Sequence, residues 1–287
     1  MINFLKYRTL AFLLSGAFLA YTITSYFTVG LKYSVDFEGG TQILFSFSQP
    51  TTSQDVERIL DEAGWPGIVT REFSNKEIMV RVKEFSGDAQ GESERVKEAL
   101  QKAMKDVTIT IESKDSVGPA AGESLRQKAL YALLLGLLAM LLYIAIRFEF
   151  SFAVGAVIAL LHDALCILGF FILLGKEISP NIIVAILTIL GCSINDTIVI
   201  FSRIRENTNK MAGRSLATIV NTSINETLRR TILTSVSTGL ALLPILVLGG
   251  AVLSDLSMAL LVGIIVGTYS SVYIASPVMM LLHKKMA

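Results

Sequence analysis

The sequence predicts an integral membrane protein: an all-α bundle of six membrane-spanning helices that carries one small α+β domain outside the membrane. Of its 287 residues, 52% are hydrophobic and only 17% are charged, which is typical of membrane proteins. The apolar residues gather in six long runs. A polar insert, residues 30–127, separates the first run from the second.

The six apolar runs are long enough to cross a bilayer, because about 20 helical residues at about 1.5 Å each cover about 30 Å. We expect spans near residues 9–29, 128–147, 151–174, 181–201, 231–250 and 256–282. The first run follows Lys6 and Arg8, so a signal peptide is the alternative. Its length favours an uncleaved anchor, because the apolar part of a signal peptide has only about 7–15 residues.

Basic residues near the span ends predict which ends face the cytoplasm. If the N-terminus is cytoplasmic, nearly all of them lie inside: Lys6, Arg8, Arg147, Arg203, Arg205, Lys210, Arg214, Arg229, Arg230, Lys284 and Lys285. Only Lys176 falls in a short outer loop, and Lys128 falls at a boundary. The sequence therefore predicts a multi-pass protein with both termini in the cytoplasm.

The chain is expected to have three parts: residues 1–29 with the first span, the outer domain 30–127, and residues 128–287 with spans two to six. The outer domain holds 12 basic and 17 acidic residues, and the remainder holds 13 and 7. The charges of the two regions therefore have opposite signs, as expected when they face different surroundings.

The outer domain shows the pattern of a ferredoxin-like fold, with no apparent metal or nucleophile constellation. Strands are expected at residues 41–47, 68–73, 77–82 and 107–112, and helices at 53–60 and 91–105. Ser53 is interpreted as the N-cap of the first helix. The resulting order, β-α-β-β-α-β, is that of the ferredoxin-like motif.

The longest cytoplasmic connection, residues 202–230, is expected to contain an amphipathic helix. Apolar residues recur there at helical spacing: Leu216, Ile219, Val220, Ile224 and Leu228. Such a helix either lies at the membrane interface or packs on the bundle.

Enzyme motifs are absent from the positions where they would be expected. Gly175-Lys176 lacks the spacing of a phosphate-binding loop, and His162-Asp163 does not form an HExxH motif. With two histidines and two cysteines in apolar runs, the sequence predicts neither a metal site nor a cofactor. We expect no enzymatic activity and no nucleic-acid partner.

Asp163 and Asp196 lie inside apolar runs, where an ionised carboxylate costs at least about 2.5 kcal/mol. Burial favours the protonated carboxyl group and a nearby cation favours the ionised one, so a carboxyl group between these influences can carry protons. Arg229 and Arg230, followed by Thr231 and Thr234, begin the fifth span. Asp196 is therefore interpreted as a proton relay, with a static Asp–Arg pair as the alternative.

Several other residues have plainer interpretations. For Asp163, a static structural role is favoured over a proton relay. His162 is expected to be packed or hydrogen-bonded. Arg203 and Arg205 fit interfacial anchors. Gly263 and Gly267 have the Gly-x-x-x-Gly spacing that allows helices to approach closely.

Taken together, these motifs resemble the SecF family, the smaller partners of SecD in the bacterial Sec protein-export machinery and members of the RND superfamily. The similar segments are Asp36-Phe37-Glu38-Gly39-Gly40-Thr41, His162-Asp163, Leu168-Gly169-Phe170-Phe171, Ser193-Ile194-Asn195-Asp196-Thr197, Arg203-Ile204-Arg205-Glu206-Asn207 and Asn225-Glu226-Thr227-Leu228-Arg229-Arg230-Thr231. The family's functional arginine falls on Arg230. Ser202 stands where the family usually has an aspartate, and Glu38 where many relatives have a small polar residue.

The resemblance implies half of an RND-type transporter in the cell inner membrane, with SecD supplying the other half. It implies that the pair uses the proton-motive force to promote preprotein translocation. SecYEG, SecA, YajC, the translocating preprotein and membrane lipid are the expected partners. Asp196 would take up a proton from outside, release Arg230, and pass the proton inward past Arg203 and Arg205. An RND-type exporter half and a passive scaffold subunit are the alternatives.

Overall fold

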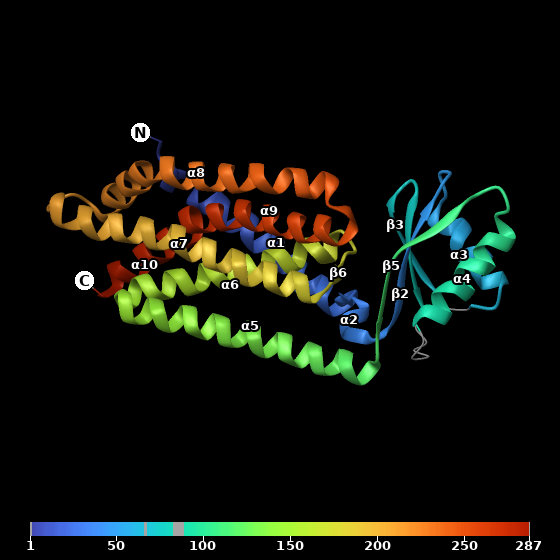
Figure 1. The fold of residues 1–287 in the computed structure, drawn as a ribbon. Coiled ribbons are helices and arrows are strands. Elements are labelled where there is room, and N and C mark those ends of the chain that lie inside the picture. Colours follow the sequence, from blue (N-terminus) through green and yellow to red (C-terminus); the bar gives the residue numbers. More distant parts are fainter. Residues whose placement is uncertain (1, 66–67, 83–88, 287) are drawn as a thin grey trace. The chain divides into compact units, whose positions relative to one another are not determined.

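The computed structural model describes residues 2–65, 68–82 and 89–286 (Figure 1). The chain divides into two compact units. The helical unit comprises Met1–Lys32 with Ala132–Ala287, and the α+β unit comprises Tyr33–Tyr131. Each unit has its own packing and is described separately.

The helical unit contains the six predicted spans, and the structure confirms all six as helices of sufficient length and hydropathy. Its helices are α1 (Arg8–Thr28), the later part of α5 (Pro119–Arg147), α6 (Phe150–Leu173), α7 (Pro180–Lys210), α8 (Leu216–Leu248), and the sixth span formed by α9 (Gly250–Ser270) and α10 (Ser276–Met286). The short elements η1 (Phe4–Tyr7), η2 (Ser271–Ala275), β1 (Lys32–Tyr33) and β6 (Glu177–Ile178) complete this part of the chain.

The core of the helical unit lies among α6, α7 and α9. These helices contact one another, and α1, η2 and α10 pack against α6. Among the six spans, α5 and α8 are the least buried, so their apolar side chains face outward. Exposed apolar faces of this length are stable against lipid or against another membrane subunit.

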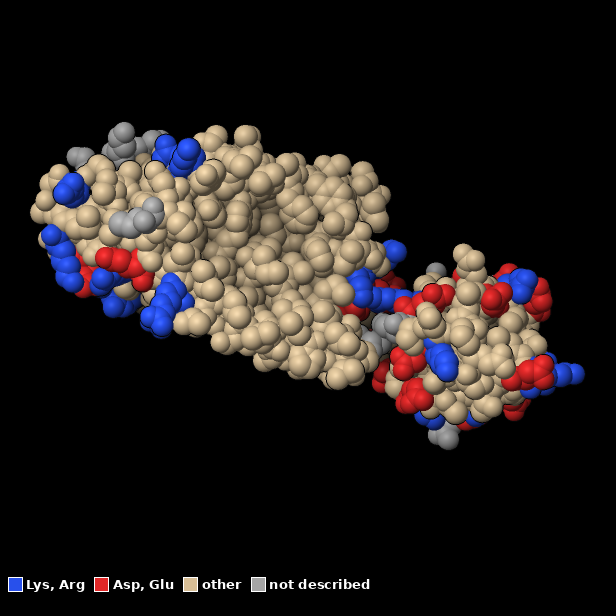
Figure 2. All heavy atoms as spheres, turned by 90° about the horizontal axis from the view of Figure 1, so that it is seen from above, with Lys and Arg blue, Asp and Glu red and all other residues tan. Residues whose placement is uncertain are grey.

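Charge is distributed along the helical unit as a membrane protein requires. On the face seen in Figure 2, the middle of this unit shows no charged side chain, and Lys and Arg gather at the end that carries both termini. On the same face, the α+β unit shows both charge signs. The charge pattern supports a helical unit that spans a membrane and an α+β unit that lies in water.

The helices extend beyond the apolar runs from which they were predicted. In residues 202–230, α7 continues to Lys210, the chain turns through Gly213 at a φ of +88°, and α8 begins at Leu216, where the Ser215 hydroxyl accepts a hydrogen bond from the Thr218 amide. The expected amphipathic helix is the first part of α8, where Ile219, Val220 and Ile224 are buried, and it continues without a break into the fifth span. Hydropathy marks only the membrane-buried portion of a helix, and hydrogen bonding continues past it.

The sixth span changes its winding at η2. Residues Ser271–Ala275 form a π-helical turn directly before Ser276 and Pro277. Pro277 has no amide hydrogen to donate into the helix. Ser276 donates through its hydroxyl group to the Ser271 carbonyl oxygen at 2.9 Å, which satisfies one carbonyl group in the widened turn.

The α+β unit has the predicted order of elements. After α2 (Val35–Glu38) come β2 (Gly40–Phe47), α3 (Ser53–Glu62), β3 (Val69–Ser74), β4 (Glu77–Val82), α4 (Ala89–Ala103) and β5 (Ile109–Val117). The four strands β2 to β5 form one sheet in the order β3-β4-β2-β5, and all neighbours are antiparallel. This arrangement confirms the ferredoxin-like fold.

The core of this unit lies between the sheet and the two helices. On β2, alternate residues are fully buried, and in the register with β4 Ile43 faces Val80 and Phe45 faces Ile78. Val56 and Leu60 of α3 and Val96 and Leu100 of α4 close the core. The predicted N-cap was wrong by one residue: Thr52 caps α3, because its hydroxyl accepts from the Asp55 amide.

Candidate functional site

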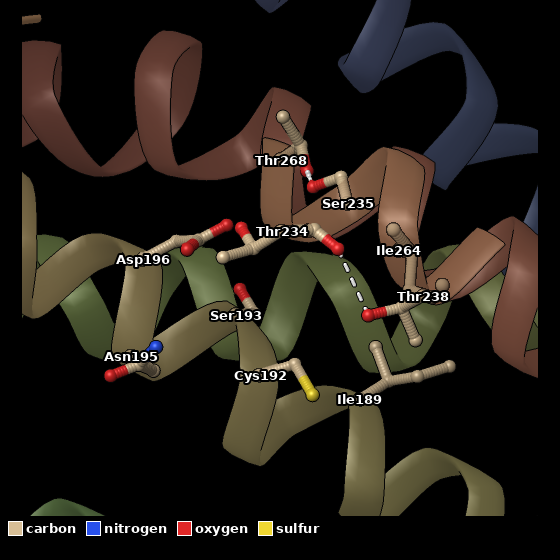
Figure 3. A pocket seen from close by; sticks show the side chains of 12 residues that line it. Ile189, Cys192, Ser193, Asn195, Asp196, Thr234, Ser235, Thr238, Ile264 and Thr268 are labelled. Atoms are coloured by element: carbon tan, nitrogen blue, oxygen red, sulfur yellow. Dashed lines mark hydrogen bonds between the residues drawn. The ribbon is translucent and has the colours of Figure 1, made fainter. Parts of the chain in front are cut away.

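Asp196 lies on α7 and lines a pocket of about 100 Å³ in the helical unit (Figure 3). The other lining residues come from α7, α8 and α9: Ile189, Cys192, Ser193, Asn195, Thr234, Ser235, Thr238, Gly263, Ile264, Gly267 and Thr268. A water molecule needs only about 10–15 Å³ by this measure, together with polar partners. The pocket therefore has the room and the hydroxyl groups to hold several water molecules beside a carboxyl group.

The Asp196 carboxyl group is half-buried and points into the pocket in the direction of Thr234 (Figure 3). Among the described residues, it takes part in no hydrogen bond or ion pair. Arg230 on α8 is exposed and close enough for its charge to act on this carboxyl group. The two predicted partners therefore interact over a distance and are not in contact in this structure.

The hydroxyl groups near the start of the fifth span have different environments. Thr234 donates to the Arg230 and Thr231 carbonyl oxygens of its own helix and faces the pocket. Thr231 is buried, and its hydroxyl oxygen has no hydrogen-bond partner among the described residues. On α7, Asn195 is exposed at the pocket and Thr197 is buried. Of the residues next to Asp196 in the sequence, Asn195 therefore faces the pocket and Thr197 faces the core of the helical unit.

Helix α9 approaches α7 closely at its two spaced glycines. A Cβ atom on Gly263 would lie 1.9 Å from the Cδ1 atom of Ile189, and one on Gly267 would lie 3.0 Å from the Cβ atom of Ser193. Both glycines also line the pocket. The close approach therefore defines the wall of the pocket as well as the helix contact.

Asp163 lies outside the pocket in the centre of the helical unit and is completely buried. Its Oδ2 atom accepts hydrogen bonds from the hydroxyl groups of Ser193 on α7, at 2.5 Å, and Ser270 on α9, at 2.8 Å. Its Oδ1 atom lies 3.0 Å from Nδ1 of His162. In contrast to Asp196, this carboxyl group is enclosed by hydrogen-bond partners.

The contacts of His162 continue from this carboxyl group to α1. Its Nε2 atom lies 3.0 Å from the Ser15 hydroxyl oxygen, which in turn lies 3.0 Å from the hydroxyl oxygen of Tyr269. Tyr269 donates to the Ala11 carbonyl oxygen at 2.8 Å. We call Ser15, His162, Asp163, Ser193 and Tyr269 the buried network. It joins α1, α6, α7 and α9.

The basic residues in the last three turns of α7 are held in place by acidic residues and by one ring. Arg203 donates to Glu226 on α8 at 2.7 Å and to Glu206 at 2.6 Å. Arg205 lies over the ring of Phe148, 5.8 Å from its centroid. With Ser202 at the family's usual aspartate position, Arg203 still has two carboxylate partners.

The residues after the first span belong to the α+β unit. Gly39 has a φ of +82°, and a Cβ atom on it would lie 2.9 Å from the Pro119 Cα atom, so only glycine fits. Gly40 also has a positive φ, and Thr41 donates to Glu92 at 2.6 Å. Asp36 accepts a hydrogen bond from Ser34. These four residues support the fold of this unit rather than the pocket.

Sequence reasoning gave no role to three residues of this region: Ser15, Tyr269 and Ser270. Hydroxyl groups inside apolar spans were the available signal, because a buried polar group needs a partner. The sequence could not show which hydroxyl groups share one centre. Among the described residues, no group of three or more histidine, cysteine or acidic side chains could hold a metal ion.

Comparisons with known proteins decide the family. The model described as "Protein export membrane protein SecD/SecF, C-terminal" matches residues 96–285, and the "SecD/SecF GG Motif" model matches residues 25–51. The chain belongs to the SecD/SecF family.

Relatives within the SecD/SecF family match nearly the whole chain. The protein translocase subunit SecF of Thermodesulfovibrio yellowstonii is 40% identical over 99% of this chain and 95% of its own length. The protein translocase subunit SecDF of Thermus thermophilus is 41% identical over 94% of this chain, which corresponds to only 37% of that longer protein.

Solved structures show the same fold. The crystal structure of SecDF, a translocon-associated membrane protein from Thermus thermophilus, has a TM-score of 0.88 at 38% identity, over all of this chain and 39% of that one. SecDF in its super-membrane-facing form has a TM-score of 0.72 at 37% identity. The RND-like fold of a SecDF half is therefore shown.

Family membership gives this chain a coarse function. It is a multi-pass membrane protein with a role in protein export, and it is a transport component rather than an enzyme of a familiar class. In SecDF relatives, the region matching this chain is fused to additional sequence, which supports SecD as its partner.

Proposed function

We propose that this chain works with SecD as a proton-driven subunit that promotes preprotein translocation across the cytoplasmic membrane, and that Asp196 carries the proton. We place both termini in the cytoplasm and the α+β unit outside it. The observation that carries the proposal is the pocket at Asp196: an acidic side chain with no contacting partner among the described residues, in a polar cavity between apolar helices.

The surface around the pocket supports a partner subunit at this place. Asn195 on α7 and Arg230 and Thr234 on α8 are exposed on helices that are otherwise apolar. Polar and charged side chains are costly against lipid and are usually found facing a bundle interior or a water-filled cavity. We assign this surface to contact with SecD, and the apolar side chains of α5 to contact with lipid.

The proposed cycle uses the separation of Asp196 and Arg230. In the ionised state, the carboxylate is attracted to the guanidinium group on α8. A proton that arrives from outside removes this attraction, α7 and α8 shift against SecD, and the proton leaves toward the inner end near Arg203. A potential of 100 mV supplies about 2.3 kcal/mol for each charge, which is enough to bias a two-state element substantially.

The remaining partners follow from the resemblance to the family. SecYEG and SecA begin the translocation of the preprotein, YajC accompanies the complex, and movement of the α+β unit favours outward progress of the emerging polypeptide. A generic RND exporter half is less well supported, because the relatives that match almost the full chain are protein translocase subunits.

The test is preprotein release from membrane vesicles that contain SecD and either this chain or its Asp196→Asn variant, with an imposed proton gradient. We expect the gradient-dependent part of release to be lost in the variant, while the amount of assembled complex stays the same. Asp61→Asn, which removes an exposed carboxylate from the α+β unit, is the matched control and should release normally. A sodium gradient applied in parallel identifies the coupling ion.

The Arg230→Ala variant tests whether Arg230 is the cation that acts on Asp196. It should lose gradient-dependent release as Asp196→Asn does, because the cation whose charge acts on Asp196 is then removed. Normal release by Arg230→Ala would show that another group is the partner. Normal release by Asp196→Asn would leave the passive scaffold as the better account.

A further inference from the structure

The buried network contains a histidine and an aspartate in direct contact, away from the pocket. Their side chains are among the most buried polar groups in the described part of the chain: Asp163 is 0% exposed and His162 is 5% exposed. The proposed cycle at Asp196 does not use this pair. Its state of protonation can be inferred from the contacts it makes.

Four successive contacts run from Asp163 through His162, Ser15 and Tyr269 to the Ala11 carbonyl oxygen, at 3.0, 3.0, 3.0 and 2.8 Å. All four distances are those of hydrogen bonds, and each bond requires one hydrogen between its two heavy atoms. The hydroxyl groups of Ser15 and Tyr269 supply one hydrogen each, and a neutral imidazole supplies one. An ionised carboxyl group supplies none. These groups together supply three hydrogens for the four contacts, so one hydrogen is missing.

With one additional proton on the His162–Asp163 pair, each of the four contacts has its hydrogen. In one distribution, the imidazole carries both ring protons and Asp163 is ionised. In the other, Asp163 is protonated and donates to Nδ1, and the imidazole keeps its proton on Nε2. In both distributions Nε2 donates to Ser15, Ser15 donates to Tyr269, and Tyr269 donates to Ala11. The pair has no net charge in either case.

Burial favours this net-neutral pair. A buried carboxylate beside a neutral imidazole would leave one uncompensated charge in the apolar interior, which costs several kcal/mol. Two hydroxyl groups, from Ser193 and Ser270, soften that cost but carry no charge. Among the described residues, no lysine or arginine pairs with Asp163 or hydrogen-bonds to it.

The other titratable groups around the pair do not supply the missing hydrogen. The thiol of Cys166, on the same helix, lies 3.5 Å from Nε2, but a hydrogen on the sulfur does not lie between Nε2 and Ser15. The phenol group of Tyr269 on α9 already donates to Ala11, and the ring of Tyr273 packs against the ring of Tyr269. In the described part of the chain, the hydrogen-bond contacts of α1 and α7 with the pair come from the hydroxyl groups of Ser15 and Ser193.

We propose that the His162–Asp163 pair is a second proton-holding site of this protein, with a proton on Nε2 of His162 that locks α6 to α1 and α9. If that proton leaves, Ser15 donates to the bare Nε2 atom, and the contact between Ser15 and Tyr269 loses its hydrogen. Two oxygen atoms then face each other at 3.0 Å without a hydrogen, which separates α1 from α9.

Ser193 connects this site to the pocket. Its hydroxyl group donates to Asp163 and its side chain also lines the Asp196 pocket, so it is the only member of the buried network at the pocket wall. In this structure the Ser193 hydrogen points to Asp163. If the hydroxyl group rotates so that this hydrogen points into the pocket, its oxygen can accept a proton from Asp163 while it gives up its own hydrogen to the pocket. The inference concerns the state of His162 and stands whether or not Asp196 drives export.

The test uses nuclear magnetic resonance of the imidazole nitrogen atoms. The chain has two histidines, so His283→Gln leaves His162 as the only one, provided that the purification tag contains no histidine. The full chain, labelled with ¹⁵N-histidine and placed in lipid nanodiscs, should show a protonated Nε2 atom at neutral pH. A bare Nε2 atom, with hydrogen on Nδ1 only, would overturn the proposal.

A matched pair of variants tests the hydrogen count itself. Ser15→Ala removes two of the four contacts, so two hydrogens suffice for the two that remain, and the fraction of Nε2 that carries a proton should fall at the same pH. Ser15→Thr keeps the hydroxyl group and should keep the proton. Equal occupancy of Nε2 in Ser15→Ala and the parent would contradict the proposed count.

Asp196→Asn separates this inference from the proposed function. The proton on Nε2 should persist in that variant, even though gradient-driven export is lost. A bare Nε2 atom in the parent, together with export that fails in Asp196→Asn, would reject the second site alone. A protonated Nε2 atom with normal export in Asp196→Asn would reject the Asp196 mechanism alone.

Discussion

Asp163 and Asp196 lie in neighbouring helices of one bundle, yet their surroundings differ in every respect. Asp163 is fully buried and contacts one imidazole and two hydroxyl groups. Asp196 is half-buried, faces a pocket, and has no contacting partner among the described residues. The charge of an acidic residue inside a membrane helix can therefore be compensated in two ways. Neighbouring side chains can neutralise it locally, or the carboxyl group can have access to water and to a distant cation.

These two environments predict different roles for Asp163 and Asp196. A carboxyl group that is balanced by its neighbours changes its charge only together with the helix contacts, because the loss of a proton removes a hydrogen from the buried network. A carboxyl group at a pocket that can hold water can gain or lose a proton without breaking a contact in this structure. The first suits a positioning role and the second a charge-changing role.

The largest effect on stability is expected from Asp163→Ala. The change leaves the donors of Ser193, Ser270 and His162 without their acceptor in the apolar core, and removal of one member of a buried pair costs about 3–5 kcal/mol. Thermal unfolding in lipid–detergent micelles should show a large decrease in stability. Asp163→Asn, which keeps the shape and one acceptor, should lose less. An Asp163→Ala variant as stable as the parent would contradict the structural role.

The two cysteines report on the two regions directly. Cys192 lines the Asp196 pocket and is exposed, whereas Cys166 is buried beside His162. A small water-soluble thiol reagent should therefore modify Cys192 much faster than Cys166, as measured by mass spectrometry of Cys166→Ala and Cys192→Ala variants. Equal rates would show that water reaches both aspartates alike.

A smaller change in stability is expected at the glycines between α7 and α9. A methyl group at Gly263 would overlap the Ile189 side chain, and overpacking of this kind costs about 1–3 kcal/mol. Gly191→Ala on α7 is the matched control, because its Cβ atom would meet nothing within 4 Å. Unfolding measured side by side should rank Gly263→Ala well below Gly191→Ala. The same stability for both would mean that α9 does not approach α7 as described.

The smallest effect on stability is expected from Asp196→Asn. The carboxyl group makes no hydrogen bond with the described residues, so its replacement should change the free energy of unfolding by less than about 1 kcal/mol. The same thermal assay measures this. A loss as large as that of Asp163→Ala would remove the distinction between the two aspartates and favour the static pair.

The sequence predicted the fold more completely than the site, for physical reasons. Spans and strands follow from local periodicity, so the six helices and the β2 to β5 order could be predicted. The end of α7 at Lys210 could not, because polar residues continue a helix beyond the membrane without an apolar signal.

The site depends on which side chains meet across helices, and one sequence does not contain that information. Asp196 was identified by its charge inside an apolar run, and Arg230 was singled out from Arg229 only by the resemblance to the SecF family. The hydroxyl partners of the His162–Asp163 pair were not identified, because Ser15 and Ser270 are separated by most of the chain and resemble any hydroxyl group in a membrane helix.

The most direct test is infrared difference spectroscopy of the reconstituted complex with SecD between acidic and basic pH. A protonated carboxyl group has its own carbonyl stretching band. The account predicts a band in the parent that disappears as the pH rises, is missing from the spectra of Asp196→Asn, and persists in the Asp61→Asn control. If no titrating band is lost in Asp196→Asn, the Asp196 carboxyl group does not change charge, and the proposed coupling is wrong.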